Sequence, residues 1–343
     1  METTHQIVTG DARKLDLPSD SVDLVVTSPP YPMIEMWDEV FAELDPDIGA
    51  ALETEDGEAA FEAMHDVLDS VWAELERVLV PGGIAAINVG DATRNLDRFK
   101  QYPNTAEITG RFRDRGFDVL PDVVWRKPAN SAAKFMGSGM IPPNAYPTLE
   151  HESILLFRNG GRRSFPPGDD QRYESAYFWE ERNRWFSDLW TDVTGTGQGL
   201  DPGLRERSGA FPLEIPLRLI RMFSIYGDTV LDPFWGTGTT TLAAMLAARN
   251  SVGYELDPEL QAAFDRRVRD LQEQSRKQAR ARLERHRAWA AQRREDGAEL
   301  EYEADHYETA VRTKQERGIR LYVVDELRET DEGYAATHVL YDP

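Results

Sequence analysis

Short apolar runs recur along the chain and alternate with segments of helical periodicity. Runs without polar interruption are typical of parallel strands that are buried on both faces. Residues 61–79 carry apolar side chains at helical spacing and end before Pro81-Gly82-Gly83. This alternation predicts an α/β fold with a central parallel sheet. The runs that we interpret as buried strands are residues 6–11, 24–26, 84–89, 228–232 and 251–255.

The middle and the end of the chain follow this rhythm less closely. Residues 108–115 have a helical pattern, and residues 119–125 and 151–157 read as two strands that extend the same sheet. Residues 32–57 are acidic and irregular, which suits either a lid beside a site or a solvated insertion. Residues 258–294 contain no glycine or proline after Pro258 and predict one long helix, and two short strands at 320–325 and 335–341 predict a small appendage.

Two strand ends carry residues that could bind a ligand or take part in catalysis. The run 24–26 stops at Ser28-Pro29-Pro30-Tyr31, because proline cannot extend a central strand. This turn places a hydroxyl, a rigid carbonyl and an aromatic ring at the carboxyl end of a strand, where open α/β sheets bind ligands. A plain structural loop is the alternative interpretation of this stretch alone.

The second strand end leads into a glycine-rich turn. Asp232-Pro-Phe-Trp-Gly236-Thr-Gly238-Thr-Thr240 follows an apolar strand and precedes a helix, as in nucleotide-binding cradles. Glu255 ends the next strand, 17 residues after Gly238. An acid at about this distance, roughly 20 residues, commonly accepts ribose hydroxyls.

Together, the Ser-Pro-Pro-Tyr and Asp-Pro-Phe-x-Gly-x-Gly motifs resemble those of the amino-group DNA methyltransferases, in the order of the β group. The resemblance covers residues 5–31, 68–92 and 208–258. It implies a Rossmann-like sheet with circularly permuted motif order, an inserted target-recognition region, a C-terminal helical and β extension, and S-adenosyl-L-methionine as cofactor. Trp235 departs from the small residue usual in this family and predicts a reshaped cofactor rim.

The resemblance also assigns roles to individual residues. Asp232 is expected to hold the methionine ammonium and Glu255 the ribose, while Asp11 either lies beside the adenine or caps the next turn. The catalytic residues are expected to be Ser28, Pro29, Pro30 and Tyr31, and the residues that bind the cofactor to be Asp11, Phe211, Pro212, Asp232, Pro233, Phe234, Gly236, Gly238, Thr239 and Glu255. No metal site is expected.

The chemistry at the Ser28 corner suits methylation of an exocyclic amine. Ser28 Oγ and the Pro29 carbonyl can accept the amine hydrogens, and Tyr31 can stack on a base flipped out of the duplex. Within the family, Ser in the first motif position is associated with N4 of cytosine. Adenine N6, an RNA amine and a non-catalytic DNA-binding relative remain alternatives, although the cofactor residues are all present.

Composition adds constraints. The chain has no cysteine, which excludes disulfides, cysteine-ligated zinc and the usual cysteine-dependent methylation of cytosine C5. The net charge of −22 resembles that of proteins from salt-loving cytoplasms and suggests a halophilic modification methylase, with CTAG as an example of a short palindromic target. There is no apolar run of roughly 18 residues and no signal pattern, so we expect a cytoplasmic protein without membrane contact.

The acidity is unevenly distributed. Residues 1–93 carry 21 acidic and three basic side chains, whereas residues 266–294 carry three acidic and 11 basic ones. Residues 158–207 combine aromatic and arginine side chains, which suits DNA readout or a small aromatic-cored subdomain. The basic helix suits a phosphate clamp, contact with another subunit, or plain solvation. The predicted DNA contacts are Arg162, Arg163, Arg182, Arg184 and Arg280.

These expectations divide the chain into four parts: residues 1–127 as the catalytic half, 128–207 as sheet extension and target recognition, 208–262 as the cofactor-binding half, and 263–343 as the basic helix and appendage. The expected partner is double-stranded DNA with a flipped base. A palindromic target would suit a homodimer, and a cognate restriction endonuclease is a further candidate partner.

Overall fold

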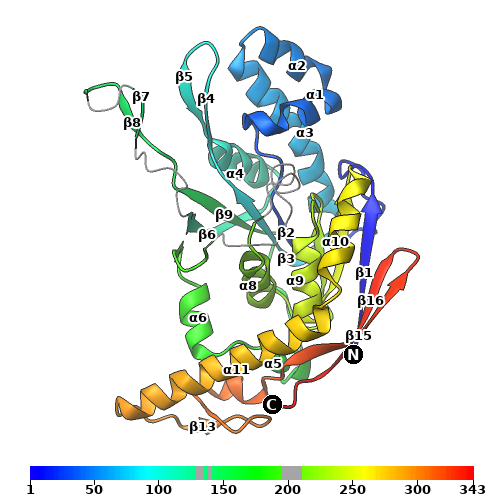
Figure 1. Ribbon diagram of the computed structural model, residues 1–343, viewed down its shortest axis with the longest axis vertical. Coiled ribbons are helices and arrows are strands. Elements are labelled where there is room, and N and C mark those ends of the chain that lie inside the picture. Colours follow the sequence, from blue (N-terminus) through cyan, green and yellow to red (C-terminus); the bar gives the residue numbers. More distant parts are fainter. Residues whose placement is uncertain (128–134, 138–140, 195–210) are drawn as a thin grey trace.

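A mixed ten-stranded sheet runs through the molecule (Figure 1). The computed structural model describes residues 1–127, 135–137, 141–194 and 211–343. In spatial order the strands are β10 (Leu189–Trp190), β6 (Asp118–Arg126), β9 (His151–Arg158), β3 (Leu79–Val89), β2 (Val22–Thr27), β11 (Thr229–Asp232), β12 (Asn250–Glu255), β1 (Glu2–Thr9), β16 (Gly333–Leu340) and β15 (Tyr322–Thr330).

The centre of this sheet is parallel and its flanks are antiparallel. β3, β2, β11, β12 and β1 run in one direction. β9 lies antiparallel to both β3 and β6, and β16 lies antiparallel to both β1 and β15. The predicted central strands and the two predicted sheet-extending strands are therefore confirmed.

Helices cover both faces because side chains alternate along each buried strand. Val25 and Ile87 face a core with Trp72 of α3 and Phe112 of α4, whereas Val26 faces the core under α8 and α9. The helices are α1 (Asp38–Leu44), α2 (Pro46–Glu53), α3 (Gly57–Val78), α4 (Asn104–Asp114), α5 (Asp170–Glu174), α6 (Trp179–Trp185), α8 (Glu214–Phe223), α9 (Thr239–Ala247), α10 (Gln261–Arg267) and α11 (Leu271–Glu295).

Residues 32–57 are more regular than predicted. They form α1 and α2 after a short 3-10 turn at Glu35–Trp37. The Asp45 side chain accepts a hydrogen bond from the Asp47 amide, and Pro46 occupies the first turn, which together start α2. Phe41 and Ile48 are buried, so the acidic surface of this segment rests on an apolar face.

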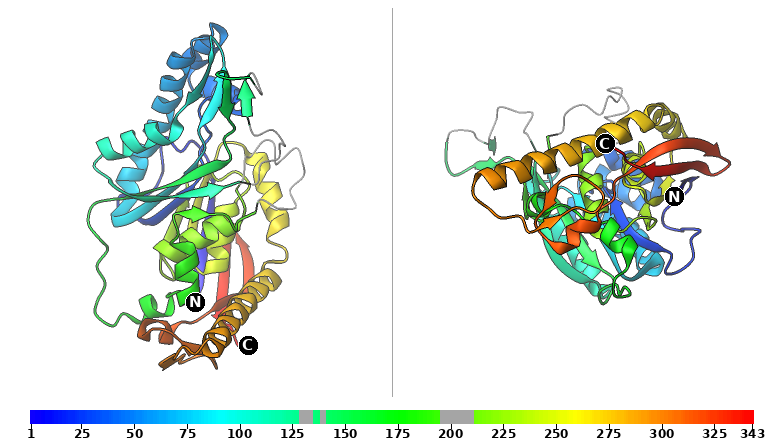
Figure 2. Two further views of the ribbon diagram at one scale, coloured as in Figure 1. Left: turned by 90° about the vertical axis from the view of Figure 1, so that its left-hand side faces the viewer. Right: turned by 90° about the horizontal axis from the view of Figure 1, so that it is seen from below.

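The predicted helix over residues 258–294 is interrupted. α10 ends at Arg267 and α11 begins at Leu271. Phe264, Val268 and Leu271 all pack into the core under α9, and the change of direction keeps them there. α11 then runs across the end of the molecule where both chain termini lie (Figure 2).

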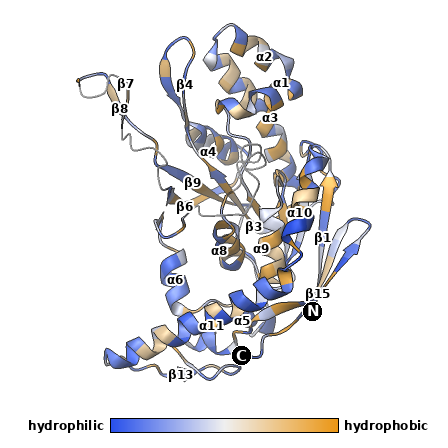
Figure 3. Ribbon diagram, in the orientation of Figure 1, coloured by the Kyte–Doolittle hydropathy of each residue, from blue (hydrophilic) through white to orange (hydrophobic). Residues whose placement is uncertain are grey.

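Helix α11, which is mostly hydrophilic (Figure 3), covers a small third core. Leu283 packs with Phe178 beside α6 and with Leu321 and Val323 near β15. Within this core Arg282 forms a buried ion pair with Glu181, with Nε to Oε1 at 2.7 Å. Arg282 and Leu283 of α11 therefore hold the C-terminal segment against α6.

The two C-terminal strands occur as predicted but do not form an appendage. β15 and β16 are joined by a tight turn, and β16 pairs with β1 from Glu2↔Thr337 to Gln6↔Gly333. They therefore extend the central sheet. A separate two-stranded pair, β13 (Tyr302–Glu303) with β14 (Ala310–Val311), lies beneath α11.

Two hairpins project from the opposite end of the molecule (Figure 1). β4 (Ala92–Asn95) pairs with β5 (Phe99–Tyr102), and β7 (Phe135–Gly137) pairs with β8 (Ala145–Pro147). The rings of Phe99 and Tyr146 stack at 5.4 Å between centroids, which joins the two hairpins. They stand at the end towards which the parallel strands point.

Candidate functional site

The Ser28 corner lies at the carboxyl end of β2, at the predicted edge of the sheet. Pro29 is buried, which fixes the turn, and Ser28 and Tyr31 are half-buried. Ser28 and Pro30 line a cavity of about 450 Å³. The corner therefore faces a space large enough for a small-molecule ligand.

The Tyr31 ring turns its hydroxyl into a network of hydrogen bonds. Tyr31 Oη lies 3.0 Å from Ser28 Oγ and donates to Glu152 Oε2 at 3.1 Å. Asn88 Nδ2 donates to Tyr31 Oη at 2.8 Å and to Glu152 Oε2 at 2.7 Å. Lys127 Nζ forms an ion pair with the other carboxylate oxygen of Glu152.

Sequence reasoning missed Asn88, Glu152 and Lys127. Each is near the catalytic edge for a topological reason: Asn88 is the last residue but one of parallel strand β3, Glu152 is the second residue of antiparallel strand β9, and Lys127 follows β6. Asn88 and Glu152 interrupt otherwise apolar strands, and this was the available signal. Their meeting point depends on the antiparallel direction of β9, which the sequence does not specify.

The cavity brings together both motif regions and the start of the chain. It lies between the Ser28 corner, the glycine turn, and helices α1 and α3. Its lining includes Asp11, Trp37, Phe41, Leu68, Pro233, Phe234, Gly236, Tyr254, Glu255, Leu256 and Asp257. Apolar and aromatic walls with a few carboxylates are typical of sites for small organic ligands.

Glu255 holds the glycine turn in place. Its Oε2 accepts the Gly236 amide at 2.7 Å and its Oε1 accepts the Asp257 amide at 2.9 Å. Burial raises the pKa of this carboxyl. Each oxygen keeps a further lone pair, so Glu255 can also accept hydroxyl hydrogens from a ligand in the cavity.

Gly238 directly precedes α9 and has a left-handed conformation, with φ at +73°. A Cβ at this position would lie 2.7 Å from Trp235 Cζ2 and would also overlap Phe264. Glycine is therefore required by both the turn and the packing. Thr239, the first residue of the helix, is buried, and its hydroxyl accepts a hydrogen bond from Arg267 at 3.0 Å.

Asp232 is buried and does not line the described cavity. It is 3% exposed and accepts hydrogen bonds from Thr27 Oγ1 at 2.6 Å and from the Phe234 amide at 3.1 Å. Burial raises its pKa to about 6. The residues that follow it, Pro233 and Phe234, line the cavity.

The structure shows the turn-closing role expected of Asp11, and its contact with an adenine stays a prediction. Asp11 lines the cavity, and its carboxylate accepts the Arg13 amide at 2.9 Å, which closes the local turn. Burial opposes ionisation of Asp11, but hydrogen bonds and the ion pair from Arg13 outweigh it and lower the pKa.

The expectation that Trp235 reshapes the cofactor rim is wrong. Trp235 is 2% exposed and points into the core, where its Nε1 donates to Thr241 Oγ1 at 2.8 Å. The ring occupies the space left by the missing side chain of Gly253. Phe211 likewise packs in the core under α8, and neither Phe211 nor Pro212 lines the described cavity.

The arginines predicted to contact DNA do not gather at the catalytic edge. Arg163 forms ion pairs with Asp228 at 2.6 Å and Asp23 at 3.1 Å, at the amino ends of β11 and β2. Arg184 lies near Asp192 and Glu214. Arg162, Arg182 and Arg280 are exposed, and they lie after β9, on α6 and on α11, respectively. Residues 128–134, 138–140 and 195–207 of the predicted recognition region lie outside the described residues.

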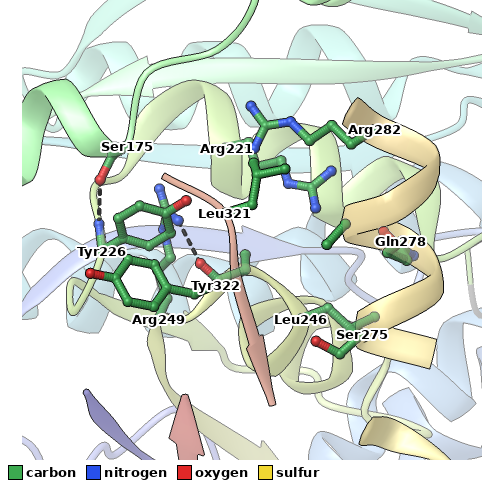
Figure 4. Close-up of a pocket in the computed structure, with 12 residues that line it drawn as sticks. Ser175, Arg221, Tyr226, Leu246, Arg249, Ser275, Gln278, Arg282, Leu321 and Tyr322 are labelled. Carbon is green, nitrogen blue, oxygen red and sulfur yellow. Dashed lines mark hydrogen bonds between the residues drawn. The ribbon is translucent and has the colours of Figure 1, made fainter. Parts of the chain in front are cut away.

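A second, much smaller cavity of about 20 Å³ lies beneath α11 (Figure 4). Arg221, Arg249, Arg282 and Tyr226 line it. It has room for about one water molecule and lies at the end opposite the Ser28 corner.

In the described part of the chain, no helix is long and apolar enough to cross a membrane.

Comparison with known proteins identifies the family. Residues 22–266 match the family described as DNA methylase. The chain is 48% identical to the Type II methyltransferase M.MthZI of Methanothermobacter thermautotrophicus over 94% of this chain and 91% of that protein. It is 51% identical to the Type II methyltransferase M.MjaI of Methanocaldococcus jannaschii over 78% of this chain and 91% of that protein.

Solved structures agree with this assignment. TTHA0409 from Thermus thermophilus, crystallised with S-adenosyl-L-methionine, is similar with a TM-score of 0.61 and 36% identity, covering 78% of this chain and 94% of that one. The cytosine-N4-specific PvuII DNA methyltransferase shares the fold, with a TM-score of 0.52, 20% identity, and coverage of 77% and 86%. The predicted Rossmann-like methyltransferase fold is thereby confirmed, and the chain belongs to the DNA methylase family.

Proposed function

We propose that this protein transfers a methyl group from S-adenosyl-L-methionine to the exocyclic N4 of cytosine in a short site of double-stranded DNA. The observation that carries the proposal is the position of Ser28. Its hydroxyl stands at the boundary between the 450 Å³ cavity and the Tyr31 network, where a cofactor and a flipped base could meet.

The residues around the cavity fit the cofactor. Glu255 offers free lone pairs to ribose hydroxyls, the Gly236 turn lets the backbone approach closely, and Phe234 with Leu256 provides apolar walls. When bound, the cofactor supplies an electrophilic methyl group on a sulfonium. Asp232 remains our candidate for the methionine ammonium, because it directly precedes Pro233 and Phe234 on the cavity wall.

The protein's own contribution is alignment. Ser28 Oγ and the Pro29 carbonyl accept the two hydrogens of the target amine, which orients its lone pair towards the methyl group. The buried Pro29 holds its carbonyl without loss of entropy on binding. Fixed geometry of this kind supplies a large share of the rate of a displacement reaction.

DNA would approach the end of the molecule that carries the Ser28 corner. The hairpins β4–β5 and β7–β8 project there, and a two-stranded ribbon fits the major groove. Arg98, at the tip of β4–β5, is 75% exposed and lies 3.8 Å from its neighbour Asp97. Because Arg163 is engaged at the opposite end, Arg98 is the better candidate for a phosphate or base contact.

Nucleoside mass spectrometry tests the reaction. DNA is incubated with the protein and S-adenosyl-L-methionine in high salt, alongside Ser28→Ala and the control Ser21→Ala, which alters a serine just before the same strand. N4-methylcytosine from wild type and Ser21→Ala, with loss in Ser28→Ala, is the expected result. N6-methyladenine would replace the proposed base, and product on RNA alone would replace the substrate class.

The target sequence that we propose, CTAG, rests on the resemblance and on the acidic composition typical of halophilic proteins. Short duplexes that contain CTAG, or a permuted site of the same composition, are compared as methyl acceptors. Equal methylation of both duplexes would refute this choice and leave the reaction itself unaffected.

A further inference from the structure

The hydrogen bonds that begin at Ser28 have a defined direction. An ionised carboxylate can only accept, so Tyr31 must donate its single proton to Glu152. Tyr31 Oη can then only accept from Ser28 Oγ, at 3.0 Å. The Ser28 proton is thus committed inward, and its oxygen is left as an acceptor for whatever lies at the corner.

Asn88 reinforces this direction. Both of its amide hydrogens are used, one on Tyr31 Oη and one on Glu152 Oε2. Its buried Oδ1 has no hydrogen-bond partner among the described residues. An unsatisfied buried acceptor costs about 1–3 kcal/mol, but the reverse amide orientation would place this oxygen against the Glu152 carboxylate. The observed orientation keeps two donors aimed at the network.

The charges around the network support the same states. Lys127 Nζ forms an ion pair with the Glu152 carboxylate. Burial, together with the negative charge of Glu152, raises the pKa of Tyr31 well above its usual value, so Tyr31 keeps its proton. The Lys127 side chain is 45% exposed, which connects this end of the network to solvent.

We propose that Glu152 makes Ser28 an obligate hydrogen-bond acceptor and also receives the proton that the target amine releases. The Ser28 corner therefore binds an exocyclic amine and rejects a ring carbonyl. This inference rests on the proposed function. Glu152 is a positioning residue, which acts on Ser28 through Tyr31. The hydroxyls of Ser28 and Tyr31 form the path of the proton.

The proton transfer balances without a further reactant. As an N–H bond of the methylated amine breaks, its proton passes to Ser28 Oγ, the Ser28 proton passes to Tyr31 Oη, and the Tyr31 proton passes to Glu152 Oε2. Ser28 and Tyr31 regain their starting forms. Glu152 is left as a carboxylic acid and returns the proton to solvent beside Lys127.

The test uses Tyr31→Phe and Glu152→Gln, with Glu150→Gln as control. Phenylalanine keeps the ring that would stack on a base and removes only the hydroxyl. Glu150 is a carboxylate just outside the network that lies 3.4 Å from Arg126. Thermal melting verifies that each variant is folded, and wild-type product is identified by mass spectrometry, which tests the proposed function separately.

We expect Tyr31→Phe and Glu152→Gln to lower kcat by about 100-fold with KM for DNA little changed, and Glu150→Gln to match wild type. Wild type should bind a duplex with cytosine at the target at least about tenfold more tightly than one with uracil, which presents a carbonyl. Tyr31→Phe should lose this preference.

A Tyr31→Phe variant with wild-type kcat and wild-type preference for cytosine would overturn the inference. If Glu152→Gln fails to fold, Tyr31→Phe decides alone, because it deletes a single oxygen. Partial recovery of kcat in Glu152→Asp would support the relay. Absence of any methylated base with wild type would instead refute the proposed function.

Discussion

Trp235 and Gly253 form a matched pair whose coupling can be measured. Trp235 is 2% exposed, and a Cβ on Gly253 would overlap its ring, with only 2.6 Å to Cγ. Trp235→Ala should destabilise the protein by about 3–5 kcal/mol through the cavity it leaves. Gly253→Ala should cost up to about 3 kcal/mol in the wild-type background, because the rigid indole cannot yield.

The double variant should be more stable than the sum of these losses. Without the indole, the methyl group introduced at position 253 meets open space, and alanine in a strand gains roughly 0.5–1 kcal/mol over glycine. The two changes should therefore couple by about 3 kcal/mol. Urea unfolding of wild type, both single variants and the double variant measures this coupling energy, with equal slopes as a check on two-state behaviour. Strict additivity would refute the packing argument, and a large loss of cofactor affinity in folded Trp235→Ala would restore the rim interpretation.

Two further predictions concern buried charges. Because the pKa of Asp232 is raised to about 6, its protonated form stabilises the folded protein, and this contribution should be lost as pH rises from about 4 to 6. Asp232→Asn should reduce the change of the unfolding free energy across this pH range, by at most about 3 kcal/mol. An unchanged dependence on pH would contradict the raised pKa of Asp232. Arg282→Met strands the buried Glu181 and should cost about 3–5 kcal/mol in low and high salt alike, whereas a loss that salt removes would indicate a solvated pair.

Site residues could be predicted from the sequence where one motif at the end of a single strand contains them. The Ser28 corner and the turn at Gly236 and Gly238 could be placed from local pattern alone, because a parallel strand brings its carboxyl end to a known edge. The cavity unites them with Asp11 and Glu255, as the order of motifs implied. These residues needed no knowledge of partners distant in the chain.

The remaining features depend on tertiary partners that local pattern does not specify. Glu152 reaches Tyr31 only because β9 runs antiparallel to β3. Arg163 looked available for DNA until the fold placed Asp23 and Asp228 beside it. Trp235 looked like a rim residue because the glycine that receives its ring lies on the next strand, 18 positions later. In each case a long-range contact decided the role.

The position of β1 has a consequence for synthesis of the protein. β1 leaves the ribosome before both strands with which it pairs, β12 on one side and β16 on the other. At roughly 5–20 residues per second, the strand waits on the order of 15–65 s for residue 340 to emerge. During that interval its edge is an open template for pairing with other chains. Thr3 and His338, whose side chains meet at 2.9 Å, join only at the end. A nascent chain stalled before β16 should therefore be the species that engages chaperones.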